Sequence, residues 1–130
     1  MNVPVEQFGK DHWSTFGYAA NVVGGLNGIP NKDRMRTDRD LHPGLVGTQV
    51  AMLESTTKYP TRLKGGIELP NHDDWDCIED LEAAGLMKWQ GTGINPIFEL
   101  TERGWKVFKA LTDFKNKGGT FATFEIPKEL

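Results

Sequence analysis

Three histidines are the residues of this chain best suited to hold a metal ion. His12, His42 and His72 each lie near an aspartate, and each is expected outside a regular helix, so the fold could gather them with Cys77 or a nearby acid. No two of them have the local spacing of a zinc finger or of a metalloprotease helix. The sequence therefore favours loop or capping roles for His12 and His72. It predicts no metal ion and no cofactor, with a site built from all three histidines as the alternative.

Nucleophilic catalysis would depend on Cys77 or Ser14. Cys77 is expected on the apolar face of a helix and beside several carboxylates, an environment that raises the pKa of a thiol. Ser14 lacks the flanking glycines that present a nucleophile at a strand-to-helix turn. Residues 91–93 lack the third glycine of a dinucleotide-binding loop, because Pro96 stands in its place. The sequence thus carries no enzyme signature, and a small metal-dependent hydrolase is only a second alternative.

An acidic helix is predicted to begin at Asp73 and Asp74, because short acidic side chains cap the free amides of a first turn. Apolar residues recur from Cys77 to Ala84 at steps of three and four residues, so they share one buried face. Gly85 is expected to end the helix in a left-handed conformation. The opposite, solvent-exposed face is predicted to carry Asp76, Glu79, Asp80 and Glu82.

Short strands and a second helix are predicted around this acidic helix. A strand is expected over residues 67–69, and residues 86–90 and 97–100 are predicted to form a hairpin around a glycine-rich turn. Thr101 can then cap the next helix. The apolar face of that helix is predicted to contain Trp105, Val107, Phe108, Leu111 and Phe114.

Two runs in this half resemble a known family. Leu81-Glu82-Ala83-Ala84-Gly85-Leu86, followed by a hairpin and by Glu99-Leu100-Thr101-Glu102-Arg103-Gly104, resembles the end of the recognition helix, the wing and the following helix of bacterial winged-helix regulators. The resemblance covers residues 72–114 and implies a winged-helix-like fold. Residues 9–16 (Gly-Lys-Asp-His-Trp-Ser-Thr-Phe) and 59–66 (Tyr-Pro-Thr-Arg-Leu-Lys-Gly-Gly) resemble small uncharacterised proteins of phages and mobile elements, which implies an origin rather than an activity.

The charge of the acidic helix departs from that family. A helix that enters a DNA groove needs Lys and Arg against the phosphates, but residues 73–84 contain six acids and no base. This pattern favours docking to a protein over reading DNA. The alternatives are that the acids only solvate the helix and that the tryptophans pack in the core. The predicted partner-binding residues are Trp75, Trp89, Asp73, Asp76 and Glu79.

The first half of the chain is predicted to form a β-hairpin. Residues 13–23 are rich in aromatic and β-branched side chains, residues 24–28 favour a reversal, and residues 29–37 could return as an edge strand. Basic residues on one face of that strand could contact phosphates, or could simply prevent sheets from joining edge to edge. The nucleic-acid-binding residues of this alternative are Lys32, Arg34, Arg36, Arg62 and Lys64.

The chain of 130 residues is predicted to form a single α+β domain with a net charge of −3. Residues 1–66 form the hairpin and loops, 67–114 the winged-helix-like part, and 115–130 a C-terminal strand and tail, with the strand over 121–126. No signal peptide or membrane-spanning run is recognised, so a cytoplasmic location is expected. The predicted function is a non-enzymatic interaction or regulatory protein of phage or mobile-element origin, which binds another protein or a second copy of itself. A winged-helix DNA-binding regulator is the first alternative.

Overall fold

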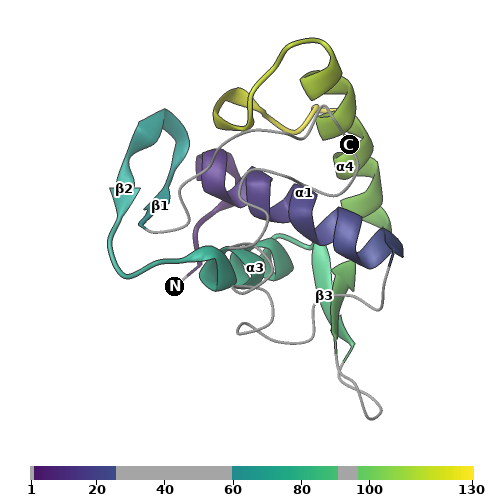
Figure 1. Ribbon diagram of the computed structural model, residues 1–130, viewed down its shortest axis with the longest axis horizontal. Coiled ribbons are helices and arrows are strands. Elements are labelled where there is room, and N and C mark those ends of the chain that lie inside the picture. The colour runs from purple at the N-terminus through teal and green to yellow at the C-terminus, as the bar shows by residue number, and fades with distance from the viewer. Residues whose placement is uncertain (1, 26–59, 91–96) are drawn as a thin grey trace.

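A computed structural model of the protein describes residues 2–25, 60–90 and 97–130 (Figure 1). In these residues the chain forms three α-helices and two antiparallel pairs of short strands, which confirms a single α+β domain. The helices are α1 (Lys10–Gly25), α3 (Asp74–Ala83) and α4 (Glu102–Asn116). The strands are β1 (Thr61–Arg62), β2 (Glu68–Leu69), β3 (Met87–Gln90) and β4 (Ile97–Leu100), and the short 3₁₀ turns are η1 (Val5–Gln7), η3 (Lys64–Gly66) and η4 (Phe121–Thr123).

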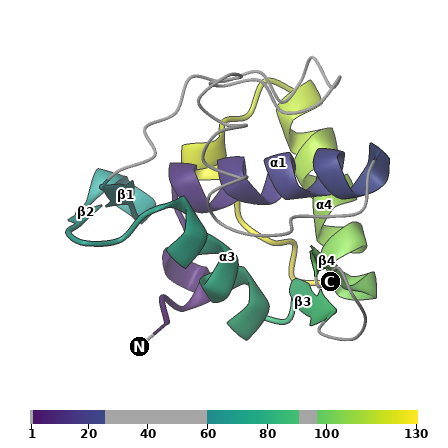
Figure 2. The same cartoon turned by 60° about the horizontal axis from the view of Figure 1, so that its bottom comes forward.

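Helix α1 is the central element of the structure. It runs between α3 and α4 and also contacts β1, β4 and η4 (Figures 1 and 2). Every residue from 11 to 20 is buried, so packing on all sides outweighs the strand preference of its aromatic and β-branched side chains. The strand predicted over residues 13–23 is therefore wrong. The returning strand at 29–37 lies outside the described residues.

Helix α3 begins and ends as its sequence predicts. The Asp73 side chain accepts hydrogen bonds from the backbone N–H groups of Trp75 and Asp76, and the Asp76 carboxylate accepts one from the Asp73 N–H. After the helix, Gly85 has a φ of 80° and the Leu86 N–H donates to the Leu81 carbonyl at 3.0 Å. The chain therefore turns sharply from α3 into the hairpin.

The two faces of α3 differ from the prediction at one residue. Cys77, Ile78 and Leu81 are fully buried, as expected. Asp80, predicted on the exposed face with Glu79 and Glu82, is only 3% exposed. Asp80 lies next to Leu81 at the border of the apolar face, and contacts with distant segments decide that it is buried.

The predicted hairpin is confirmed as β3 and β4, which pair from Met87 with Leu100 to Gln90 with Ile97. The predicted strand over 67–69 is confirmed as β2, which pairs with β1 and not with the hairpin. In the described residues the β3–β4 hairpin is therefore a sheet of two strands.

Helix α4 begins at its predicted cap. The Gly104 N–H donates to Thr101 Oγ1 at 3.0 Å, and Val107 and Leu111 are fully buried on the apolar face. Trp105, predicted on the buried face, is 40% exposed and lies edge-on against Phe108 at the border of that face. The placement of Trp105 in the core is therefore corrected.

The C-terminal segment packs against α1 without forming the strand predicted over 121–126. It forms η4 and then an extended stretch, and no strand among the described residues pairs with it. Phe121 and Phe124 are both buried, and the Phe124 ring meets Trp13 edge-on at 4.9 Å between centroids. Ile126 also packs against the core, so the predicted inward direction of Phe124 and Ile126 is right although the strand is wrong.

Within the described parts of the chain, none of the helices has the length and apolar character that crossing a bilayer requires.

Substitution of Gly104 by Ala tests how closely α4 approaches the end of α3. A Cβ atom at Gly104 would lie 2.1 Å from the Leu86 carbonyl oxygen, a backbone atom that side-chain motion cannot relieve. We expect Gly104→Ala to lower the free energy of unfolding by about 1–3 kcal/mol, measured by urea denaturation. The exposed Lys106→Ala variant should stay within about 0.5 kcal/mol of the wild type. An unchanged urea midpoint for Gly104→Ala would contradict this close approach.

Candidate functional site

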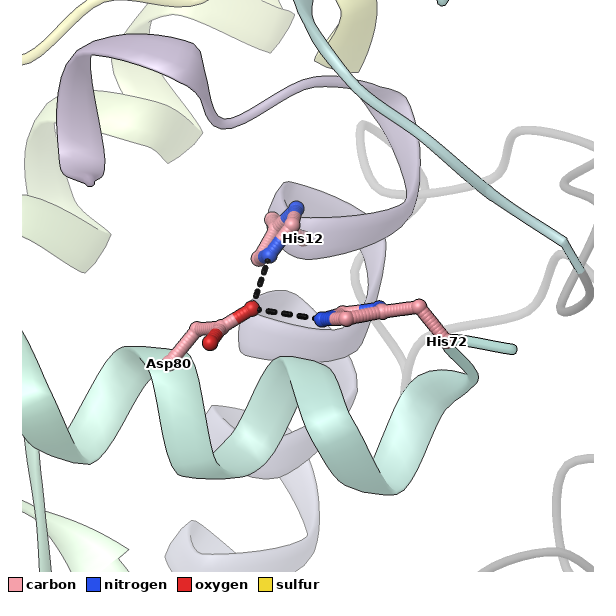
Figure 3. A group of neighbouring side chains, drawn as sticks. All are labelled: His12, His72 and Asp80. Atoms are coloured by element: carbon pink, nitrogen blue, oxygen red, sulfur yellow. Dashed lines mark hydrogen bonds and ion pairs between the residues drawn. The ribbon is translucent and has the colours of Figure 1, made fainter. Parts of the chain in front are cut away.

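The buried carboxylate of Asp80 is the centre of a polar cluster (Figure 3). Its Oδ2 atom lies 2.8 Å from His12 Nε2 and 2.8 Å from His72 Nε2. Its Oδ1 atom accepts hydrogen bonds from the Asn2 side-chain amide at 3.2 Å and from the Val3 N–H at 3.1 Å. One side chain of α3 thus joins the N-terminal segment, α1 and the residue before the α3 cap.

His12 is held in position by its helix and by an aromatic neighbour. It lies in the first turn of α1, not in the predicted loop, and its side chain is fully buried. Its ring stacks on Phe8, with centroids 4.2 Å apart and an interplanar angle of 5°. The stack fixes the ring plane, so Nε2 points at Asp80 (Figure 3).

His72 is held in position by strand β1. Its Nδ1 lies 2.6 Å from Thr61 Oγ1, and the Thr61 N–H donates to the His72 carbonyl at 3.0 Å. Strand β1 can lie against the start of α1 because residue 9 is glycine. A Cβ atom at Gly9 would be 2.5 Å from the Arg62 carbonyl oxygen. His72 therefore has both a backbone and a side-chain partner on β1.

The hydrogen bonds of the cluster determine its charge. Burial alone would raise the pKa of Asp80, but the hydrogen bonds from His12, His72, Val3 and Asn2 outweigh it and hold that pKa well below its usual value. Burial lowers the pKa of His12 and outweighs the opposing hydrogen bond to Asp80. At neutral pH the Asp80 carboxylate is therefore ionised, and His12 is a neutral donor.

An acidic hollow opens beside this cluster. Its volume is about 490 Å³, and it reaches His72 and Asp80 from the solvent side of α3. Among the described residues its lining contains four carboxylates and no lysine or arginine, so these residues create a negative potential that attracts cations. The lining residues are Asn2, His72, Asp76, Glu79, Asp80, Glu82 and Ala83.

The structure brings together two of the three histidines considered as metal ligands. His12, His72 and Asp80 each offer one ligand atom, and these atoms lie within 4.8 Å of one another. His42 lies outside the described residues. Sequence reasoning missed Asp80 because helical periodicity assigned it to the exposed face. The available signal was its place next to the apolar residue Leu81.

The predicted partner-binding residues have different environments. Asp73 and Asp76 form the capping box of α3, and Asp76 also lines the hollow together with Glu79. Trp75 is partly buried against the core, whereas Trp89 on β3 is 40% exposed. The structure therefore brings Asp76 and Glu79 into one acidic site and places neither tryptophan in its lining.

The predicted nucleic-acid-binding residues are only partly described. Lys32, Arg34 and Arg36 lie outside the described residues. Arg62 lies 3.5 Å from Glu68, and Lys64 forms an ion pair with Glu125. A neighbouring carboxylate offsets the positive charge of each, which weakens the case for a phosphate-binding patch here.

The candidate nucleophiles are both buried. Cys77 is fully buried near Thr61, and burial raises its pKa well above the usual value of a thiol, with the nearby Asp11, Asp80 and Asp74 adding to the rise. Ser14 is buried within α1. The interpretation of Cys77 as a small buried apolar residue agrees with this geometry.

No protein-family model, curated protein or solved structure matches this chain. The order of helix, hairpin and helix over residues 74–116 is the order that the winged-helix resemblance implies. That resemblance, and the resemblance to phage proteins, stay predictions.

Substitution of Asp80 by Asn tests the structural contribution of the cluster. The amide keeps the shape of the carboxylate but removes its charge and weakens the hydrogen bonds from both histidines. We expect the free energy of unfolding to fall by about 3 kcal/mol, measured by urea denaturation. Glu82→Gln removes one exposed charge from the same helix and should change it by less than about 0.5 kcal/mol. Equal effects of the two substitutions would contradict a special role for Asp80.

The lowered pKa values predict that acid destabilises the protein in two steps. The unfolded chain binds a proton at His12 near pH 6.5 while the folded chain does not, so stability falls as the pH drops below 6.5. Asp80 causes a second loss of stability as the pH falls below 3.8, the ordinary pKa of an aspartate, because the unfolded chain then binds a proton that the folded chain does not. The urea midpoint at about pH 7.5 and at about pH 5 measures the first step. His12→Gln should reduce the difference between them, and an unchanged difference would contradict the neutral state of His12.

Proposed function

We propose that this protein is a non-enzymatic interaction protein that binds a basic segment of another protein in the acidic hollow beside α3. The observation that carries the proposal is the lining of that hollow, which presents four carboxylates and, among the described residues, no lysine or arginine. A lysine- or arginine-rich segment has the complementary charge, which accelerates association and selects against acidic partners.

The position of α3 in the chain supports a docking role. It is followed by the β3–β4 hairpin and by α4, so it occupies the place of a recognition helix in the predicted winged-helix arrangement. Its sequence from Asp74 to Ala83 contains no lysine or arginine, and Glu79 and Glu82 are exposed. Such a surface repels the phosphates of a duplex and attracts basic peptide segments.

Two further features favour binding over catalysis. The candidate nucleophiles Cys77 and Ser14 are both shielded from solvent. Trp89, exposed on β3, is of a residue type that often dominates the energy of protein interfaces. Trp89 is therefore a candidate apolar contact in addition to the electrostatic contact at the hollow.

A charge reversal in the hollow tests this function. Glu82→Lys should weaken binding of a fluorescent arginine-rich peptide by about tenfold or more at low salt, measured by fluorescence anisotropy, because it replaces attraction by repulsion. Glu129→Lys makes the same change in net charge at an exposed residue outside the hollow, and should have a much smaller effect.

The DNA-binding alternative gives a different result. A duplex bound with steep salt dependence, and lost in an Arg62→Ala, Lys64→Ala double variant, would replace the proposal. Equal weakening of peptide binding by Glu82→Lys and Glu129→Lys would also contradict it, because binding would then follow net charge and not the hollow.

A further inference from the structure

We propose that His12 Nε2, His72 Nε2 and Asp80 Oδ2 bind a divalent transition-metal ion, and that Zn²⁺ suits them well. The three atoms come from α1, from the residue before the α3 cap and from α3 itself, and they converge on one point (Figure 3). All three lie within 4.8 Å of one another. This inference concerns an ion at the floor of the hollow and does not depend on protein docking above it.

The donor set determines the class of ion. Two imidazole nitrogens and one carboxylate oxygen suit Zn²⁺ and other divalent first-row metals, and the same set occurs in open metal sites. Mg²⁺ and Ca²⁺ prefer oxygen ligands, so two imidazoles select against them. The site is therefore expected to discriminate between Zn²⁺ and Mg²⁺.

The two distances from the histidine nitrogens to Asp80 Oδ2 are close to those between neighbouring ligands of a coordinated ion. Bonds of about 2.0–2.2 Å to a tetrahedral Zn²⁺ place neighbouring ligand atoms roughly 3.3 Å apart. The two histidine nitrogens lie 2.8 Å from Asp80 Oδ2. Each of these two nitrogen–oxygen pairs therefore has to separate by only about 0.5 Å for an ion to replace the two ring protons that face the carboxylate.

Contacts behind the ligands hold each of them in place. The His12 ring stacks on Phe8, His72 Nδ1 lies 2.6 Å from Thr61 Oγ1, and Asp80 Oδ1 accepts hydrogen bonds from Asn2 and Val3. Such outer contacts orient metal ligands and commonly change metal affinity by about 10- to 100-fold. This preorganisation distinguishes the cluster from a chance group of surface acids and histidines.

The acidic hollow supplies a route and an attractive field. His72 and Asp80 line it, so an ion can reach them from solvent, and Asp76, Glu79 and Glu82 raise the local concentration of cations. Water from this hollow can fill the coordination positions that the protein leaves open. His12 does not line the hollow and is fully buried.

The second ring nitrogen of His12, Nδ1, limits the expected affinity for the metal ion. Coordination at Nε2 requires its ring proton at Nδ1, which is buried and has no hydrogen-bond partner among the described residues. An unsatisfied buried donor weakens binding by roughly ten- to hundredfold. We therefore expect a dissociation constant on the order of micromolar, well above that of structural zinc sites.

Calorimetric titration of the full chain with Zn²⁺ tests the site. The protein is purified without a histidine tag, treated with a chelator and titrated with Zn²⁺, with Mg²⁺ as the control ion and Co²⁺ as a spectroscopic probe. We expect one Zn²⁺ per chain, no measurable Mg²⁺ binding, and Co²⁺ absorption typical of a low-coordinate site with nitrogen ligands. Absence of Zn²⁺ binding would overturn the proposal and leave the cluster as a purely hydrogen-bonded one.

Matched variants assign the ion to these residues. His72→Gln and Asp80→Asn should each weaken Zn²⁺ binding by at least about 100-fold. The loss of a direct ligand lowers metal affinity more than the loss of an outer contact does. Glu82→Gln removes a charge from the hollow without removing a ligand and should weaken it by less than about tenfold. His72→Gln keeps the bond between His12 and Asp80, so it remains informative if Asp80→Asn does not fold. Unchanged Zn²⁺ binding in His72→Gln would overturn the assignment, whatever the peptide experiments show.

Discussion

The carboxylate of Asp80 is the point at which separate segments of the chain meet. Burying an ionised carboxylate costs several kcal/mol, and each hydrogen bond to a charged group contributes about 1.5–3 kcal/mol. Asp80 accepts four such bonds, from Asn2, Val3, His12 and His72. Each further donor offsets more of the cost of desolvating the charge. Folding thus brings the N-terminal segment, α1 and the segment before α3 together at one carboxylate.

Two glycines make this arrangement sterically possible. Gly9 lets the backbone of β1 approach the start of α1, which places Thr61 beside His72. Gly104 lets the start of α4 approach the backbone of Leu86 at the end of α3. Neither glycine has a positive φ, so the reason for each is space and not backbone conformation. The two glycines thus allow backbone contacts between elements that a larger residue would prevent.

The same helix has a structural and a solvent-facing role. Its buried face carries Cys77, Ile78, Leu81 and the charged Asp80, and its exposed face carries the acids that line the hollow. The charge of Asp80 adds to the negative potential of this surface, since Asp80 itself lines the hollow. Any ligand of this surface is therefore expected to be cationic, whether it is a basic peptide segment or a metal ion.

Local sequence patterns are sufficient to predict the elements that depend on neighbouring residues. The capping box of α3, its end at Gly85, the β3–β4 hairpin and the Thr101 cap of α4 all follow from chemistry within a few positions of each residue. The helical conformation of residues 13–23 follows only from the folded molecule, because burial of every residue from 11 to 20 outweighs their strand preference. The candidate site also needed the tertiary structure. His12 and Asp80 are 68 positions apart, and no local pattern records a contact between residues so distant in the chain.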